Sequence, residues 1–169
     1  MATVFLGVGS NLGDRKANIE RAIDLLKEHR DIEVVAVSGL IETEPAGGPL
    51  QGKFLNGALE IDTDLLPLEL LSRLKGVERR LGRPKTEEPN SPRTIDLDIL
   101  FYDDVVITEG RNLKIPHSRL SERLFVLKPL AEIAPDFVHP RLAKTVRELL
   151  EAVQAAHPFE SRPAGDKAE

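Results

Sequence analysis

The start of the chain changes from an apolar run to a helical pattern. Residues 3–10 (TVFLGVGS) are short, rich in β-branched side chains and closed by glycine and serine, which predicts a strand. In residues 11–29 the apolar side chains recur at the i, i+3, i+4, i+7 spacing of one helix face, and Asp14 is placed to cap that helix. The pattern therefore predicts a strand followed by an amphipathic helix.

The middle of the chain repeats this order with more strands. Residues 32–45 predict a second strand, and the alternating apolar positions of residues 54–64 predict a third. Pro67 suits the first turn of a second helix, and Gly82 follows its end. Its expected buried stripe consists of Leu70, Leu71, Leu74 and Val77. Residues 93–104 predict the fourth strand.

The rest of the chain adds helices to this pattern. Residues 105–117 predict an outlying hairpin, and residues 123–135 and 144–156 predict two helices. The order β-α-β-β-α-β is that of the ferredoxin-like core, an α+β fold with an antiparallel sheet and helices packed on it. We expect a single domain over residues 1–157 with extra C-terminal helices, and a flexible tail over residues 158–169.

The composition narrows the class of protein. With 169 residues, 41% of them hydrophobic, the chain is long enough for one domain with its own core. It has no cysteine, which rules out disulfides and thiolate metal sites and is typical of a reducing cytosol. A net charge of −5 argues against broad binding of nucleic acid or anionic membranes, and no apolar run approaches membrane-spanning length. We expect a soluble, cytoplasmic protein.

Two aspartates stand out in the predicted fourth strand. Asp96 and Asp98 alternate with apolar residues in TIDLDIL, so both carboxylates point to the same face of the strand. Neighbouring negative charges repel, and burial would raise at least one of the two pKa values, so a compensating cation is expected. Oxygen ligands without cysteine favour Mg²⁺ or Mn²⁺ over zinc, and such a metal commonly holds nucleotide phosphates. The alternative is a solvated strand face that forms salt bridges with nearby arginines.

Other polar groups near this strand allow a functional or a structural interpretation. A nucleoside triphosphate needs cationic donors, and three candidates flank the strand, namely Arg83, Lys85 and Arg93. The glycine-rich turn GVGSNLGD joins a strand to a helix but matches neither common phosphate-loop motif, so it indicates a tight turn. His117 is a lone histidine, a type more often structural. Asn56 reads a polar heterocycle or caps a turn, and Phe54 and Phe125 are core residues by default.

Several segments carry a more specific signal. They are, in chain order, GVGSNLGDR, ETEP, QGKFLNGA, ERRLGR, PRTIDLDIL and IPHSRLSERLFVLKPLAEIAP. Together they resemble the 6-hydroxymethyl-7,8-dihydropterin pyrophosphokinases over nearly the whole chain, to about His157. The resemblance implies an enzyme of folate biosynthesis that moves the pyrophosphoryl group of ATP to the hydroxymethyl group of a pterin and releases AMP. It also implies that ATP binds first, and we expect the enzyme to be a monomer.

The resemblance also assigns residues to this activity. Two Mg²⁺ ions would lie on Asp96 and Asp98. Contacts to the triphosphate are implied for Arg83, Arg93, His117 and, in a supporting role, Lys85. The pterin would lie between Phe54 and Phe125, with hydrogen bonds to its edge from Thr43 and Asn56. Glu78 and Arg123 match positions near the site, and residues 84–92 correspond to the mobile catalytic lid of the family. The expected catalytic residues are Arg83, Arg93, Asp96 and Asp98.

Two departures from the family pattern bear on kinetics. Asn90 and Ser91 stand where the family often has Trp-Gly, and Ser118 follows the histidine where Pro or Tyr is usual. Neither change touches the metal ligands, so we expect altered kinetics with activity retained. Two other classes are compatible with parts of the pattern: a nucleotidyltransferase with a Gly-Ser turn and a DxD strand, and a non-catalytic small-molecule sensor. The sequence distance between Gly9 and Asp96 disfavours the first of these.

Overall fold

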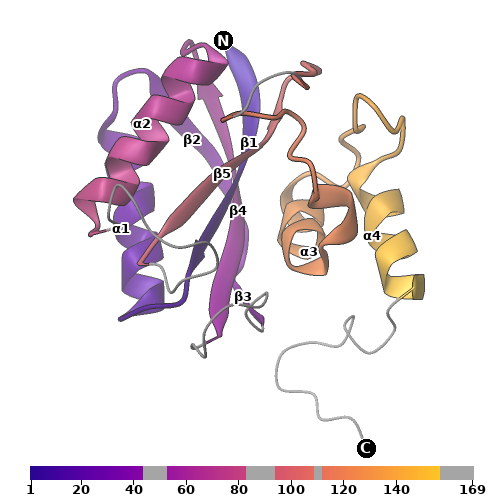
Figure 1. The fold of residues 1–169 in the computed structure, drawn as a ribbon, viewed down its shortest axis with the longest axis horizontal. Helices are drawn as coiled ribbons and strands as arrows, with labels where there is room; N and C mark the ends of the chain where they lie inside the picture. Colours follow the sequence, from indigo (N-terminus) through magenta and orange to yellow (C-terminus); the bar gives the residue numbers. More distant parts are fainter. Residues whose placement is uncertain (44–52, 83–93, 109–111, 157–169) are drawn as a thin grey trace, which may run out of the picture.

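A computed structural model describes residues 1–43, 53–82, 94–108 and 112–156 (Figure 1). In chain order its elements are β1 (Ala2–Ser10), α1 (Arg15–Glu28), β2 (Ile32–Val37), β3 (Ile41–Thr43), β4 (Phe54–Thr63), α2 (Pro67–Arg80), β5 (Asp96–Tyr102), the 3-10 turn η1 (Leu120–Glu122), α3 (Leu124–Ile133) and α4 (Val146–Ala156). The predicted α+β fold, with a ferredoxin-like core and extra C-terminal helices, is confirmed. Within the described ranges, no helix is long and apolar enough to cross a membrane.

The strands form one antiparallel sheet in the order β2-β4-β1-β5, with β3 paired to the start of β4. β1 is central, so residues of β4 and β5 lie on either side of it. A register shift between Phe5 and Leu6 on the β5 side changes the alternation of side chains near Leu100. After that shift, toward the end of β1, Gly7 and Gly9 face β5 in regular register.

The prediction of one continuous second strand is wrong, because residues 38–40 interrupt it and divide it into β2 and β3. At the break, Ser38 is buried, its backbone N–H donates to the Ala58 carbonyl, and its hydroxyl accepts a hydrogen bond from the Ala58 N–H at 2.8 Å. The same hydroxyl donates to the Gly39 carbonyl at 2.7 Å. The Ser38 hydroxyl therefore takes the place of a backbone carbonyl as the acceptor for the Ala58 N–H. Strand periodicity does not reveal such a side-chain hydrogen bond.

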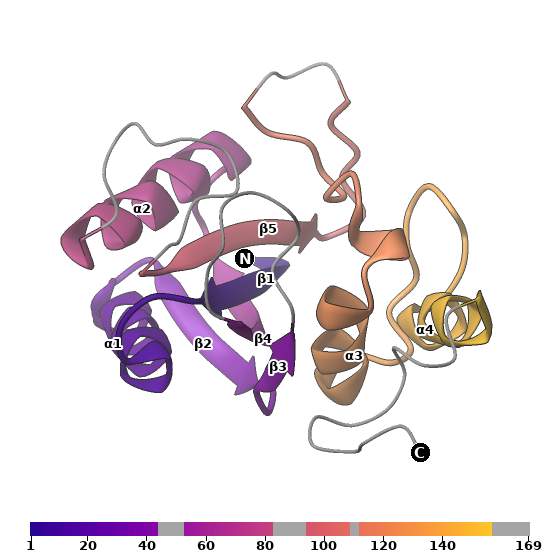
Figure 2. The same ribbon diagram turned by 60° about the horizontal axis from the view of Figure 1, so that its bottom comes forward.

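Two layers of helices enclose the sheet. Figures 1 and 2 show α1 and α2 against one face and α3 and α4 against the other. The first core includes Leu6, Leu26, Leu74 and Leu97. The second core includes Phe5, Phe101, Leu127 and Val146. Because helices pack on both faces of the sheet, a ligand site is expected where part of a face is not covered by a helix.

The helix boundaries follow the predicted signals. Asp14 caps α1, since its carboxylate accepts a hydrogen bond from the Ala17 N–H at 3.1 Å. α2 begins at Pro67 and is followed by Gly82, whose φ of 96° suits glycine. Leu70 and Leu74 of its predicted stripe are fully buried, and Leu71 and Val77 pack on the same core while partly exposed. Of the residues predicted as an outlying hairpin, the described ones form one isolated bridge, Ile107 to Ile115.

His139, between α3 and α4, is buried in its neutral form. It is 6% exposed, and its Nδ1 accepts hydrogen bonds from the N–H groups of Arg141 and Leu142 at 3.1 and 3.2 Å. Its ring meets Phe101 edge-on with centroids 5.4 Å apart. Burial and the charge of Arg141 lower the pKa of His139. Protonation at Nδ1 would remove the acceptor for both N–H groups.

Wild-type stability is therefore expected to fall in mildly acidic solution. Because the folded-state pKa of His139 is depressed, its contribution is complete above the unfolded-state value of about 6.5 and is lost as pH falls below it toward the folded-state pKa. Denaturant midpoints at about pH 8 and about pH 5 measure this loss. His139→Asn keeps a side-chain acceptor without titrating, so its midpoint is expected to fall less between the two pH values. An equal fall in both proteins would contradict the assignment.

A candidate active site on one face of the sheet

The two predicted metal ligands lie side by side on β5. Leu97 and Ile99 are buried in the core beneath α1 and α2, so Asp96 and Asp98, both half-buried, face the other side of the sheet. They lie opposite Gly9 and Gly7 of β1, respectively. The atoms nearest to a Cβ added at either glycine belong to residues other than the two aspartates.

The donor set suits a hard divalent cation. Among the described residues, no group of three or more His, Cys, Asp or Glu side chains is placed to hold a metal. In the described part of the chain, β5 therefore offers a pair of carboxylates. Mg²⁺ is commonly bound in this way, through one or two carboxylates together with phosphate oxygens and water. The geometry fits the predicted magnesium site, while the number of ions stays a prediction.

The predicted polar recognition residues lie on the same face, two strands away. In the β1–β4 register Asn56 lies opposite Gly9, so Asp96, Gly9 and Asn56 form one row across three strands. Thr43 and Phe54 are paired at the adjoining position of β3 and β4. The Asn56 Nδ2 donates to the Thr43 Oγ1 at 2.7 Å. The sheet register therefore brings Thr43, Phe54 and Asn56 to the face that carries the aspartates.

This register removes one reason given above against a nucleotidyltransferase. Gly9 and Asp96 are far apart in the sequence but directly opposite each other in the sheet. Sequence distance was a poor guide, because antiparallel pairing with the central strand joins the two ends of the described core. The choice between enzyme classes must therefore come from other residues.

Phe125 lies in the layer that covers this face. It belongs to the first turn of α3, is half-buried, and has the Arg123 guanidinium 5.5 Å from its ring centroid. α3 packs against β3 and β4. Within the described part of the chain, the ring pairs join Phe5, Phe101, Phe137 and His139, so Phe54 and Phe125 do not stack on each other. The two rings come from separate layers, an arrangement compatible with a flat ligand between them.

His117 adjoins the aspartates from the segment after β5. Its backbone N–H donates to the Leu100 carbonyl at 3.0 Å, and its Nδ1 accepts from the Arg119 N–H at 3.4 Å. Burial lowers the pKa of His117, as do Arg123 and Arg119, while Asp96 acts in the opposite direction. The imidazole is therefore within electrostatic reach of Asp96 and is favoured in its neutral form.

A cavity of about 210 Å³ opens beside Asp98 and His117. Its other lining residues are Leu71, Lys75, Leu97, Ile99, Asn112, Leu113, Lys114 and Ser118. Lys75 and Lys114 were not predicted as site residues, since single lysines on a helix or loop carry no motif. Lys75 could have been noticed from its i, i+3 spacing to Glu78. The cavity combines apolar walls with cations and one carboxylate of the pair predicted to bind metal.

Glu78 holds the strand that carries the aspartates. The side chain is 2% exposed, and its Oε2 accepts a hydrogen bond from the Leu97 N–H at 2.8 Å. Lys75 Nζ lies 3.3 Å from its other oxygen. The accepted N–H belongs to the residue between Asp96 and Asp98, so this contact fixes the backbone from which both carboxylates project. Periodicity missed the burial of Glu78, because its partner lies on another element.

Like Glu78 on β5, Arg15 holds the backbone beside predicted site residues, here at the β3–β4 end of the face. Its Nη1 lies 3.2 Å from Glu42 Oε1 and donates to the Lys53 carbonyl at 2.9 Å. These two residues directly adjoin Thr43 and Phe54. One guanidinium thus links the end of β3 to the start of β4, a role that sequence pattern did not suggest.

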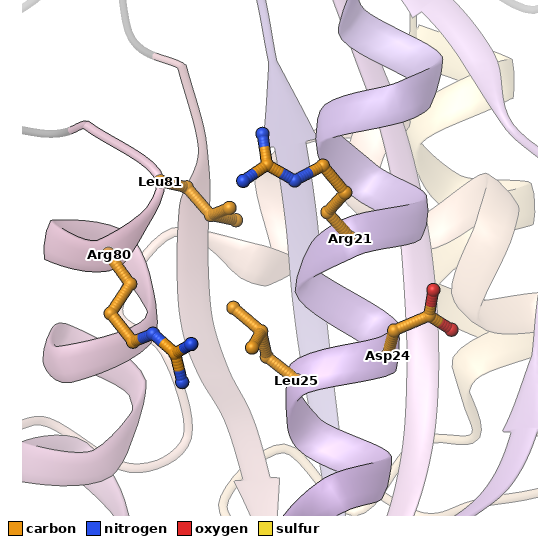
Figure 3. Close-up of a pocket in the computed structure, with 5 residues that line it drawn as sticks. All are labelled: Arg21, Asp24, Leu25, Arg80 and Leu81. Atoms are coloured by element: carbon orange, nitrogen blue, oxygen red, sulfur yellow. The ribbon is translucent and has the colours of Figure 1, made fainter.

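Several predicted site residues fall outside the described residues. They are Arg83, Lys85 and Arg93, together with the lid of residues 84–92 and the tail of residues 158–169. A second cavity, of about 230 Å³, lies between α1 and α2 and is lined by Arg21, Asp24, Leu25, Arg80 and Leu81 (Figure 3). It contains none of the predicted site residues. The described part of the site is therefore the sheet face with α3 and the segment around His117.

Comparisons with known proteins identify the family of this chain. Residues 5–135 match the family model of 7,8-dihydro-6-hydroxymethylpterin-pyrophosphokinase (HPPK). A 2-amino-4-hydroxy-6-hydroxymethyldihydropteridine pyrophosphokinase of Aquifex aeolicus is 46% identical over 148 residues, covering 88% of this chain and 90% of that protein. The protein of the same name from Bacillus subtilis is 46% identical over 129 residues, covering 76% of each.

A solved structure supports the fold independently of sequence. A Plasmodium falciparum HPPK-DHPS chain superposes with a TM-score of 0.74 at 16% identity, and the match covers 95% of this chain. It covers 47% of that chain, so the present sequence spans about half of the solved protein. At this identity the likeness concerns the fold alone.

Proposed function

The chain belongs to the 7,8-dihydro-6-hydroxymethylpterin-pyrophosphokinase family, and on this premise we propose that it transfers the pyrophosphoryl group of ATP to 6-hydroxymethyl-7,8-dihydropterin. This is a step of folate biosynthesis, and AMP is the second product. The observation that supports the proposal is the row of Asp96, Gly9 and Asn56, because the carboxylates proposed to hold Mg²⁺ and the amide proposed to recognise the pterin share one face. A nucleotide site alone would not require the Asn56–Thr43 pair.

The reaction needs positioning more than a strong base. The hydroxymethyl oxygen attacks the β-phosphorus of ATP, the bond between that phosphorus and the oxygen bridging to the α-phosphorus breaks, and AMP leaves with the bridging oxygen. The hydroxyl proton passes to solvent. Asp96 and Asp98 would hold two Mg²⁺ ions. Bound Mg²⁺ neutralises phosphate charge and lowers the pKa of the attacking pterin hydroxyl. The rest of the rate enhancement would come from in-line placement of the two substrates on one rigid sheet.

The nucleotide would lie at the outer edge of β5, and the pterin would lie over β4 on the face that carries the aspartates. The cavity beside Asp98 and His117 is suited to the nucleotide, because it offers apolar walls, two lysines and a metal-binding carboxylate. The pterin would lie between Phe54 and Phe125, with Asn56 and Thr43 at its polar edge. Arg83, Arg93 and Lys85 would contact the triphosphate, and residues 84–92 would close over the site.

The test is AMP formation from ATP and Mg²⁺ with and without 6-hydroxymethyl-7,8-dihydropterin. We expect AMP only when the pterin is present and none when another alcohol replaces it. Binding of the pterin without any AMP would favour the sensor class. Size-exclusion chromatography of the same preparation tests the expected monomer, and the cytoplasmic location is an expectation of the same proposal.

A further inference from the structure

Gly9 belongs to the glycine-rich turn that matched no phosphate-loop motif, and the proposed reaction gives it no role. We propose that Gly9 is a positioning residue, whose missing side chain makes the space in which Asn56 is held for pterin recognition. The inference rests on the proposed function for the identity of the ligand. The steric relation between Gly9 and Asn56 can be tested without any ligand.

The space above Gly9 is occupied by the Asn56 side chain. A Cβ at Gly9 would lie 2.7 Å from Asn56 Oδ1, which is closer than real Cβ atoms approach an oxygen. The next contacts would be Phe54 Cδ1 and the Leu55 carbonyl, both at an ordinary 3.6 Å. The conflict therefore concerns the Asn56 oxygen in particular.

Asn56 cannot yield to such a Cβ without losing its partner. Its Nδ2 donates to Thr43 Oγ1 at 2.7 Å, while its Oδ1 lies over Gly9, so the carboxamide is held from both sides. A shift that relieves contact with β1 turns the amide away from Thr43. Gly9 and Thr43 thus fix the orientation of one recognition group, and they do so from two different strands.

Backbone conformation does not explain this glycine. Gly9 lies within the extended strand β1, whereas among the described glycines those with positive φ are Gly13 and Gly82. Alanine is therefore compatible with the backbone at position 9, and the requirement for glycine is steric.

Gly7 provides a matched control. It lies two residues earlier on the same strand and the same face, opposite Asp98 and Ala58. A Cβ there would approach the Leu100 side chain at 3.5 Å, which is ordinary contact. Alanine at position 7 adds the same methyl group beside the same site without touching Asn56.

The experiment is a double-mutant cycle on ligand affinity. Binding of the pterin is measured by calorimetry with a non-hydrolysable ATP analogue and Mg²⁺ present, for wild type, Gly9→Ala, Asn56→Ala and the double variant. We expect Gly9→Ala to weaken pterin binding by roughly tenfold, as for a lost or misdirected hydrogen bond. In the Asn56→Ala background the same change should add nothing, since the residue it displaces is gone. Gly7→Ala should bind the pterin like wild type.

Two further readings make the test specific. The ATP analogue should bind Gly9→Ala with wild-type affinity. Thermal unfolding should show Gly9→Ala less stable than wild type, and the stability cost of this change should shrink in the Asn56→Ala background. This second cycle uses no ligand and remains decisive if Gly9→Ala folds poorly.

The outcomes separate the inference from the function. Equal pterin affinity of wild type and Gly9→Ala, additive effects of the two changes, or equal weakening of both ligands would overturn the inference while leaving the pyrophosphokinase proposal intact. If wild type binds no pterin, the proposed function fails. Non-additive stability effects would then still show steric contact between position 9 and Asn56, but a role of Gly9 in pterin recognition would be excluded.

Discussion

In the Asp98→Ala variant, pterin-dependent formation of AMP is expected to fall by about a thousandfold or more. Asp98 shares its face of β5 with Asp96 and lines the cavity assigned to the nucleotide. A cation held by a pair of carboxylates loses half of its protein ligands when one is removed. Several kcal/mol of charge stabilisation at the transferred group depend on that cation, and each 1.36 kcal/mol corresponds to a factor of about ten.

The fold should survive this change. Asp98 is half-buried, its side chain belongs to neither hydrophobic core, and its backbone stays in the β1–β5 ladder. Asp104→Ala removes the same charge from an exposed position just after β5 and serves as the control, with activity close to wild type. Unfolding midpoints of both variants should lie near the wild-type value. Turnover of Asp98→Ala close to that of Asp104→Ala would remove the metal assignment from β5.

Glu78→Ala is expected to lower AMP formation by roughly ten- to a hundredfold although the residue is one step removed from the substrates. The Glu78 carboxylate accepts the hydrogen bond of the Leu97 N–H, between Asp96 and Asp98. Alanine leaves that buried N–H without this acceptor, which costs about 1–3 kcal/mol of folding stability. Displacement of β5 by even a fraction of an ångström then moves both carboxylates, and misplacement of about 1 Å costs on the order of a hundredfold in rate.

A conservative variant distinguishes positioning from general destabilisation. In Glu78→Gln the side-chain oxygen can still accept from Leu97, so most of the activity and stability should return. The dependence of rate on Mg²⁺ concentration gives a second measurement, and Glu78→Ala should need more Mg²⁺ for half-maximal activity. If Glu78→Ala loses stability while its Mg²⁺ dependence stays at the wild-type level, Glu78 supports the fold and does not position the metal ligands.

Local sequence signals were sufficient for much of the fold. The N-cap at Asp14, the start of α2 at Pro67 and its end before Gly82 each depend on residues within a few positions of one another. The same is true of the placement of Asp96 and Asp98 on one face, which follows from the period of a strand. The break at Ser38 was missed, because it depends on a hydrogen bond to Ala58 on another strand.

By itself, the sequence determined the kinds of element, their order, and the alternation that keeps both aspartates on one face, since these depend on short-range periodicity and capping. The tertiary structure decided which residues meet across the sheet and between its layers. Pairing of β1 with both β4 and β5 places Gly9 between Asn56 and Asp96, and packing of α2 brings the Glu78 carboxylate to the Leu97 N–H. Such contacts join positions far apart in the chain. Their register is fixed by the burial of whole faces, a collective property that no single segment contains.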